Sequence, residues 1–256
     1  MTAGDVPVVI VTGASRGLGY TIAEKLLTAS AKVVAVARSE AGMAKLAEQY
    51  PGQVEYVTGD LGDYDTGVKA VQTAINKFGS LSGIVFNAAI ISPVSTIATT
   101  DIEAFKKLFD VNFFSIITTL KAAIPYLRES KGKVVLVSSE ASFESHFYGW
   151  EAYGSSKACV NHLAATLAGE EPDIFAISVD PGVMDSAMQQ EIREQHGSQM
   201  KSEHHEYLVK VKEDGTIPST EPPATVISNL VVKGPMELSG TYYAFNSPAL
   251  SPYLTA

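Results

Sequence analysis

The stretch Val6-Pro7-Val8-Val9-Ile10-Val11-Thr12-Gly13-Ala14-Ser15-Arg16-Gly17-Leu18-Gly19 decides the fold. Its first part, residues 6–11, is an apolar run of mostly β-branched residues, which is typical of a parallel strand buried on both faces. Helical periodicity begins directly after the glycines, over residues 20–27. Glycines in this position permit a sharp turn and let backbone N–H groups approach a pyrophosphate at a helix N-terminus. The spacing differs from the G-x-G-x-x-G fingerprint, so a purely structural turn is the alternative.

The alternation of strand and helix continues along the chain. Further strands are predicted at 31–37, 54–57, 83–86, 133–137, 175–179 and 240–245, and further helices at 41–49, 64–78, 102–127, from 153 onward and at 224–232. About seven strands separated by helices predict an α/β fold, in which residues 1–256 form a single domain. The expected architecture is a Rossmann-type doubly wound parallel sheet with helices on both faces and ligands at the carboxyl ends of the strands. Residues 184–218 break the alternation, and this polar segment is predicted to be a substrate lid.

Composition narrows the class of function. The chain has 256 residues, 46% of them hydrophobic, and a formal net charge of −9, which argues against nucleic acid or an anionic membrane surface as a partner. Cys159 is its one cysteine, so no intrachain disulfide forms and a reducing compartment is expected. Neither a secretory signal nor a run of about 18 apolar residues is present, and we expect a cytoplasmic protein.

Tyr153 and Lys157 are the candidate catalytic pair. They open an apolar helical pattern four residues apart, which places them on one face of a helix. A phenol with an ordinary pKa of about 10 is a poor proton shuttle at neutral pH. A neighbouring ammonium stabilises the phenolate and lowers that pKa. The alternative is an ordinary Tyr and Lys at helical spacing, without a catalytic role.

Charges near the second strand indicate which dinucleotide binds. An acid about twenty residues after the glycine turn binds the ribose 2′-hydroxyl of NAD, whereas a 2′-phosphate needs a nearby arginine. Arg16 lies inside the turn, and Arg38 and Ser39 follow the second strand. Two guanidinium groups and a hydroxyl favour NADP(H). Glu40 is the reservation, although an acid at a helix start often faces solvent.

Five ordered motifs resemble those of the short-chain dehydrogenase/reductase family. They are the turn from Thr12 to Gly19, Asn87-Ala88-Ala89 with Asn112, Ser138-Ser139, Tyr153 with Lys157, and Pro181-Gly182. The resemblance covers nearly the whole chain and implies hydride transfer between a nicotinamide and a carbonyl or alcohol. The runs 149–157 and 181–189 look like the branch that contains sepiapterin reductase and fungal benzil reductase.

The resemblance implies a role for each matching catalytic residue. Tyr153 would be the general acid in carbonyl reduction, and Lys157 would lower its pKa and hold the nicotinamide ribose. Ser139 would hydrogen-bond the substrate oxygen, with Ser138 as the competing choice. Asn112 would anchor a water that links Lys157 to solvent, unless it is a mid-helix Asn that bonds backbone or solvent.

The resemblance also implies the cofactor contacts. Asp60 would receive the adenine amino group, unless it only forms a turn. The expected cofactor-binding residues are Gly13, Ser15, Arg16, Gly17, Leu18, Gly19, Arg38, Ser39, Asp60, Leu61, Asn87, Ala88, Tyr153, Lys157, Pro181, Gly182, Val183 and Ser186. Two departures from the family pattern affect this site. Ala89 replaces a glycine near the nicotinamide, and the loop between Ser139 and Tyr153 is one residue longer than usual.

That longer loop is rich in aromatic residues, which favour apolar or aryl ketones and α-diketones as substrates. Phe147, Trp150 and Met184 are the expected substrate contacts, although some of the loop's rings are expected to pack on the lid or on a partner subunit. The expected activity is that of an NADPH-dependent carbonyl reductase that forms a chiral alcohol. An oxidative dehydrogenase of a steroid, sugar or polyol is the main alternative, and a non-catalytic nucleotide sensor is another.

Two expectations concern partners and metals. The helices 102–127 and 153–169 carry more apolar positions than one sheet face buries, and in the resembled family they form a four-helix interface. A homodimer or homotetramer is therefore expected. The histidines of the polar segment, His196, His204 and His205, match no metal-ligand spacing, so no metal site is expected.

Overall fold

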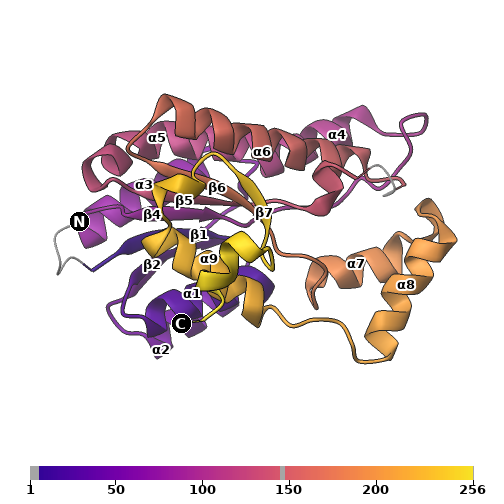
Figure 1. Ribbon diagram of the computed structural model, residues 1–256, viewed down its shortest axis with the longest axis horizontal. Coiled ribbons are helices and arrows are strands. Elements are labelled where there is room, and N and C mark those ends of the chain that lie inside the picture. The colour runs from indigo at the N-terminus through magenta and orange to yellow at the C-terminus, as the bar shows by residue number, and fades with distance from the viewer. Residues whose placement is uncertain (1–5, 145–147, 256) are drawn as a thin grey trace.

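In the computed structural model, which describes residues 6–144 and 148–255, one parallel sheet of seven strands forms the centre of the protein (Figure 1). The strand order is β3-β2-β1-β4-β5-β6-β7. The strands are β1 (Val8–Thr12), β2 (Lys32–Ala37), β3 (Val54–Thr58), β4 (Gly83–Phe86), β5 (Lys133–Val137), β6 (Phe175–Asp180) and β7 (Tyr242–Ala244). The order reverses between β1 and β4, and this is the point where an open α/β sheet leaves a crevice.

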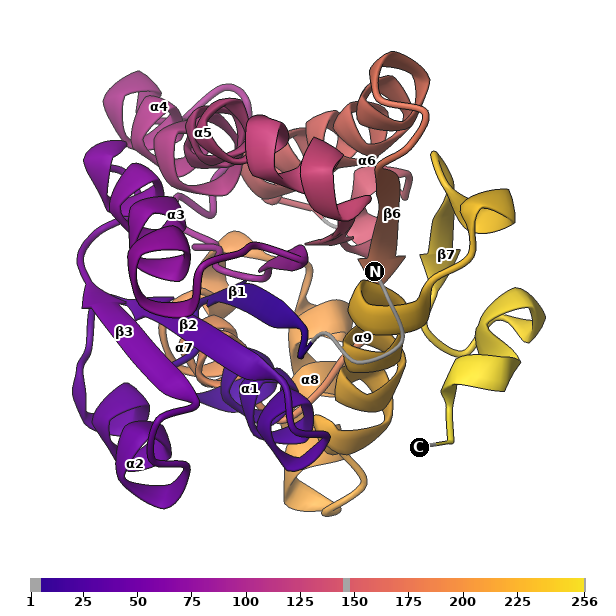
Figure 2. The ribbon, with the colours of Figure 1, turned by 90° about the vertical axis from the view of Figure 1, so that its left-hand side faces the viewer.

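Helices cover both faces of the sheet, as Figure 2 shows. One face carries α1 (Gly17–Thr28), α2 (Ala41–Gln49) and α9 (Glu221–Lys233), and the other carries α3 (Asp65–Phe78), α4 (Ile102–Phe109), α5 (Ser115–Ser130) and α6 (Glu151–Glu170). Alternate residues of β1 enter opposite cores. Val9 and Val11 pack toward the first face, whereas Val8 and Ile10 pack toward the second. The apolar run of β1 therefore reflects burial on both faces, and the predicted doubly wound fold is confirmed.

The helix predicted at 102–127 is present and extends over Ile102–Ser130. It contains a π-helical turn, Asp110–Phe114, between α4 and α5, which the sequence did not predict. This turn contains Asn112, whose side-chain amide bonds the main chain of Ile90. Apolar periodicity cannot reveal such a turn, because one extra residue hardly disturbs the apolar pattern on either side. The other elements agree with the sequence, and 41–49, 83–86 and 133–137 have the predicted bounds.

The stretch Ile102–Ser130 is long and apolar enough to cross a membrane by length and composition. A window of 18 residues within it has a mean hydropathy of 1.3, and 44% of that window is buried inside the protein. The core between the sheet and the helices α3, α5 and α6 includes Leu120, Ala123 and Leu127. A core helix that covers a sheet passes the same test of length and composition.

The polar segment 184–218 forms two helices, α7 (Ala187–Gln195) and α8 (Ser202–Glu213), which extend away from the sheet (Figure 1). Three of its apolar residues are buried together. Ile192, Met200 and Leu208 pack with Trp150 and Tyr153 in a third core at the carboxyl ends of the strands. This third core joins the segment to the start of α6.

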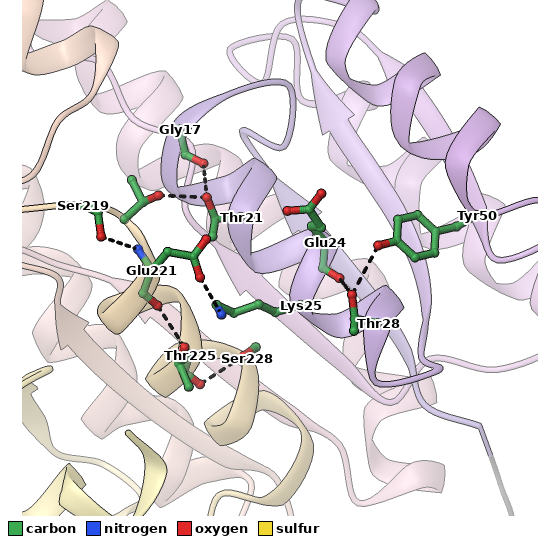
Figure 3. Close-up of polar contacts among 11 residues, drawn as sticks. Gly17, Thr21, Glu24, Lys25, Thr28, Tyr50, Ser219, Glu221, Thr225 and Ser228 are labelled. Carbon is green, nitrogen blue, oxygen red and sulfur yellow. Dashed lines mark hydrogen bonds and ion pairs between the residues drawn. The ribbon is translucent and has the colours of Figure 1, made fainter. Parts of the chain in front are cut away.

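The chain just after the α7–α8 segment, at the start of α9, is fixed to α1. The hydroxyls of Thr21 and Thr220 lie 2.8 Å apart, and Lys25 Nζ lies 2.7 Å from Glu221 Oε2 (Figure 3). Thr21 also donates to the carbonyl of Gly17, at the start of α1. The segment therefore leaves the sheet after β6 and returns beside the glycine turn.

Candidate active site

The glycine turn is held by main-chain contacts and by Asn87. The amide Nδ2 of Asn87 donates to the carbonyl of Thr12 at 2.9 Å. The hydroxyl of Thr12 accepts from the backbone N–H groups of Asn87, at 2.9 Å, and Ala88, at 3.0 Å. A Cβ on Gly19 would lie 2.3 Å from the carbonyl oxygen of Gly13 and 2.5 Å from Asn87 Nδ2. The ends of β1 and β4 are thus fixed together, and position 19 has no room for a side chain.

A cleft of about 650 Å3 lies above the carboxyl ends of the strands. It brings together nearly all the residues predicted from the sequence. They are Gly13, Ser15, Arg16, Gly17, Leu18, Arg38, Ser39, Asp60, Leu61, Asn87, Ala88, Ser139, Trp150, Tyr153, Lys157, Pro181, Gly182, Val183, Met184 and Ser186. Phe147, a predicted substrate contact, lies outside the described residues.

Two predicted site residues do not line the cleft. Gly19 packs inside the turn, as its contacts with Gly13 show. Asn112 is fully buried, and its side chain bonds the N–H and the carbonyl of Ile90, both at 2.9 Å, and the hydroxyl of Ser156 at 3.2 Å. The amide of Asn112 therefore fixes the chain after β4 to α6. An Asn that bonds the backbone was the alternative given by the sequence, and the water relay stays a prediction.

The hydroxyls of Tyr153 and Ser139 face each other at the cleft. Tyr153 is in the first turn of α6 and is 8% exposed, and Ser139 follows β5 and is partly buried. Burial raises the pKa of Tyr153 above its ordinary value. The side chain of Ser139 opposes this rise, and the negative charge of Asp180 adds to it. The phenol is therefore protonated at neutral pH, as a proton donor must be.

Lys157 lies one helical turn after Tyr153, and its Nζ is 5.6 Å from the centre of the Tyr153 ring. The ammonium donates to the carbonyl of Val137 at 2.7 Å. Burial lowers the pKa of Lys157 to about 8, and the negative charge of Asp180 limits the fall. The sequence predicted that Lys157 lowers the pKa of Tyr153. Burial dominates the shift, so the net pKa of Tyr153 is raised, and the effect of Lys157 on it stays a prediction.

Two arginines border the other end of the cleft, where Arg16 caps the start of α1 and Arg38 follows β2. Both are exposed. Glu40, the acid that counted against NADP(H), accepts a hydrogen bond from Tyr56 at 2.9 Å and does not line the cleft. Asp60 lines the cleft while its Oδ1 accepts from the N–H of Gly62 at 2.9 Å. Asp60 therefore closes a turn. Its other carboxylate oxygen, Oδ2, accepts no hydrogen bond from the residues that the structure describes.

The α7–α8 segment supplies cleft residues that were not predicted individually. They are Ala187, Met188, Gln189, Glu191, Ile192, His204 and Leu208. Trp150 stands between this segment and the catalytic pair, with its ring centre 5.9 Å from Tyr153 and 5.7 Å from His204. Met184, Met188 and Ile192 recur every four residues in an otherwise polar stretch. This helical periodicity is the signal that could have identified the face toward the cleft.

A small polar network joins α7 to the chain after β4. The hydroxyl of Ser92 donates to Glu191 Oε1 at 2.9 Å and lies 3.2 Å from His196 Nε2. His196 Nε2 lies 3.4 Å from the same Glu191 oxygen. His205 has a different partner, the carbonyl of Arg193 at 2.8 Å. Within residues 6–144 and 148–255, no group of three or more His, Cys, Asp or Glu side chains is arranged to hold a metal ion.

Comparison with known proteins agrees with this geometry. The family model described as short chain dehydrogenase matches residues 7–197. A benzil reductase of Saccharomyces cerevisiae that forms (S)-benzoin is 37% identical and covers 96% of this chain and 98% of its own length. The chain belongs to the short-chain dehydrogenase/reductase family and is an oxidoreductase, and a nicotinamide dinucleotide is that family's cofactor.

Solved structures show the same fold. A short-chain dehydrogenase/reductase of S. cerevisiae is 40% identical and superimposes with a TM-score of 0.93, over 96% of this chain and 99% of that chain. A second structure, of a cytoplasmic protein of unknown function from S. cerevisiae, is 40% identical with a TM-score of 0.81, over 96% and 99% of the two chains.

The residues of the cleft fit a nicotinamide dinucleotide. A Cβ on Gly17 would meet no atom within 4 Å, so the backbone borders open space where a pyrophosphate needs a close approach. The hydroxyl of Ser138 is buried at the wall of the cleft and has no hydrogen-bond partner among the described residues. A ligand in the cleft would satisfy this group. Arg16, Ser15 and Leu18 would hold the phosphates, and Lys157 would hold the ribose beside Tyr153.

Proposed function

We propose that this chain is an NADPH-dependent carbonyl reductase that converts an apolar or aryl ketone or α-diketone into a chiral alcohol. The observation that carries the proposal is the position of the Tyr153–Ser139 hydroxyl pair. It lines the cleft beside an apolar chamber formed by Trp150, Ile192 and Leu208. A carbonyl group held in the chamber would meet both hydroxyls.

The chain's own residues supply the proton chemistry. When bound, the nicotinamide supplies the hydride. Burial keeps Tyr153 protonated, so its hydroxyl donates a proton to the carbonyl oxygen, which Ser139 also holds by a hydrogen bond. Lys157, with a pKa of about 8, is an ammonium at neutral pH and stabilises the phenolate that forms. Proton loss from Lys157 or Tyr153 therefore limits the rate as the pH rises.

Preference for NADPH rests on the charges at the end of β2. Arg16 and Arg38 border the cleft there, and Glu40 is held by Tyr56 outside it. A bound 2′-phosphate would lie near two guanidinium groups and would not be repelled by the carboxylate of Glu40.

Arg38→Ala should weaken NADPH binding by about 10-fold or more and leave NADH binding within about 2-fold.

The apolar chamber supports an aryl or diketone substrate. Trp150, Ile192 and Leu208 are each more than nine-tenths buried and form its walls. Flat apolar groups gain the most from such walls, because burial of aromatic surface is favourable and ring edges pack on ring faces. A benzil reductase among the relatives has a substrate of this class. The α7–α8 segment, residues 184–218, would act as the lid over this substrate.

Self-association is proposed through α4, α5 and α6. Phe114 and Ile117 are exposed on this side of the molecule. A shallow groove lies between the π-helical turn and α6, lined by Phe113, Ala158, Cys159, His162, Leu163 and Thr166. A second copy of the chain would cover these apolar groups, giving a homodimer or homotetramer. Light scattering that shows only a monomer would contradict this proposal. We also propose that the protein is cytoplasmic.

The test is a panel of aryl ketones, α-diketones and the corresponding alcohols, assayed with NADPH, NADH and their oxidised forms, with chiral analysis of the products. We expect diketone reduction with NADPH to have the highest kcat/KM. No hydride transfer to any carbonyl would overturn the proposal. A higher kcat/KM for oxidation of steroid, sugar or polyol alcohols would assign the chain to oxidative dehydrogenases instead.

A further inference from the structure

Asp180 is a buried carboxylate of the cleft that no motif in the sequence identified. It is the last residue of β6, is 8% exposed, and lines the cleft beside the catalytic pair. Its Oδ1 accepts from the N–H of Gly182 at 2.9 Å, and its Oδ2 accepts from the hydroxyl of Tyr242 at 3.4 Å. The backbone of Glu140 also lies near this carboxylate and lowers its pKa. One side chain therefore joins the chain ends after β5 and β6 to β7.

Two of these groups, Glu140 and Gly182, belong to segments that carry cleft residues. Glu140 follows Ser139 directly, and Gly182 precedes Val183. Tyr242 is half-buried and also packs its ring edge against Phe143, with ring centres 4.9 Å apart. The hydrogen bonds of Asp180 thus fix the positions of the substrate-side serine and of the turn after β6.

Asp180 also acts by its charge. The charged and titratable groups that face it are Lys157 and Tyr153 from α6 and Tyr242 from β7. Glu140 lies nearby, and its negative charge raises the pKa of Tyr242. The ammonium of Lys157 donates to the neutral carbonyl of Val137, so this bond brings it no opposite charge. Val137 pairs with Val179 on the adjacent strand, and Asp180 follows Val179, so the ammonium and the carboxylate lie at neighbouring strand ends and both line the cleft. Asp180 is the anion whose attraction opposes the burial of Lys157. Burial raises the pKa of Asp180, and the hydrogen bonds from Gly182 and Tyr242 and the charge of Lys157 oppose this rise, so the attraction is reciprocal.

We propose that Asp180 is the counter-charge that keeps Lys157 in its ammonium form, and that it positions the segments carrying Ser139 and Val183. It is a positioning residue, since it acts through Lys157 and Tyr153. The inference rests on the proposed function, because a protonated Lys157 matters for turnover only where Tyr153 passes on a proton. The alternative is that Asp180 only closes the turn at Gly182, which an asparagine would do equally well.

Asp180→Asn separates charge from shape, because its side-chain oxygen accepts from Gly182 as before while the negative charge is lost. Without the anion, the pKa values of both Lys157 and Tyr153 fall. Both changes move the alkaline limb of the plot of kcat/KM against pH in the same direction, to lower pH. We expect this limb to move to lower pH by about one unit, with activity at pH 8 reduced about 10-fold and activity at pH 6 within about 2-fold of the wild type. Tyr242→Phe is the control, because it removes one hydrogen bond and keeps the charge, and its alkaline limb should stay with that of the wild type.

A second measurement needs no turnover. The pH titration of the Lys157 ammonium, followed by 15N NMR of the side-chain nitrogen, should move to lower pH in Asp180→Asn and stay within about 0.3 unit in Tyr242→Phe. An unchanged Lys157 titration, or an unchanged alkaline limb in an active enzyme, would overturn the inference. A wild type that reduces no carbonyl would overturn the proposed function alone, since the NMR titration still tests Asp180. If Asp180→Asn does not fold, Asp180→Ser carries the same two tests, because its hydroxyl also accepts from Gly182.

Discussion

Main-chain atoms make the wall of the cleft at the glycine turn, whereas side chains make it at α7 and α8. At the first end, Gly19 packs against the carbonyl of Gly13, and Asn87 bonds the main chain of Thr12. At the second end, Met188 and Ile192 present flexible or branched apolar groups. A wall of backbone recognises what all dinucleotides share, and a wall of side chains can differ from one substrate to another.

The two ends also differ in how strongly they are held. The glycine turn is part of the central sheet, where β1 pairs with β2 and β4. The α7–α8 segment is held by the third core, by Ser92 with Glu191 and His196, and by exposed pairs such as Lys212 with Asp185. Exposed ion pairs contribute about 1 kcal/mol or less. The segment is therefore the part of the cleft that can move at low cost.

Tyr153→Phe tests the point where the two ends meet and should have the largest effect. Loss of the hydroxyl removes the proton donor, so we expect kcat to fall about 1,000-fold while the dissociation constant for NADPH stays within about 3-fold. Steady-state kinetics and fluorescence titration measure the two quantities. Tyr207→Phe, an exposed position on α8, is the control and should keep full activity. Retained turnover in Tyr153→Phe would refute its assignment as the acid.

Gly19→Ala should break the first end of the cleft. The added Cβ would lie 2.3 Å from the carbonyl oxygen of Gly13, so the turn has to shift. We expect the free energy of unfolding to fall by roughly 3 kcal/mol, with loss of NADPH binding, as urea unfolding and titration would show. Gly169→Ala is the control on α6, where the added Cβ meets nothing within 4 Å. This control should be stabilised by about 0.5 to 1 kcal/mol.

Lys157→Met should show how much the buried ammonium lowers the free energy of unfolding. Because the pKa of Lys157 falls from 10.5 to about 8 on folding, the folded state binds fewer protons than the unfolded state between these values. The stability of the wild type relative to Lys157→Met should therefore rise through this pH range, by up to roughly 3 kcal/mol, and be constant below pH 7. Urea unfolding between pH 6 and 10 measures this. Lys210→Met, at an exposed position, should show no such slope, and a flat difference for Lys157→Met would contradict the buried charge.

Ser92→Ala should loosen only the second end and have the smallest effect. It removes the hydroxyl that contacts Glu191 and His196. One such contact contributes about 1 kcal/mol, so we expect KM for the carbonyl to rise about 5-fold, with NADPH binding and the melting temperature nearly unchanged. Ser251→Ala, an exposed serine far along the chain, should change none of these. A weaker affinity for NADPH in Ser92→Ala would show that the two ends are coupled.

The sequence predicted the dinucleotide end better than the substrate end. Buried strands leave long apolar runs, and a glycine turn between a strand and a helix has few alternatives, so the bounds of β4 and β5 and the cleft residues around Gly13 were accessible to sequence reasoning. The substrate end uses single residues from distant segments. Glu191, His204 and Leu208 have no spacing relation to Trp150, and only folding brings them together.

The sequence by itself determined the parallel sheet, the glycine turn and the placement of Tyr153 and Lys157 on one helix face, because these follow from local periodicity and backbone conformation. Tertiary structure decided the π-helical turn at Asn112, the direction of the Tyr153 pKa shift, and the burial of Asp180 beside Lys157. The reason is physical. Desolvation and charge interactions depend on distances between segments far apart in the chain, which no local pattern records.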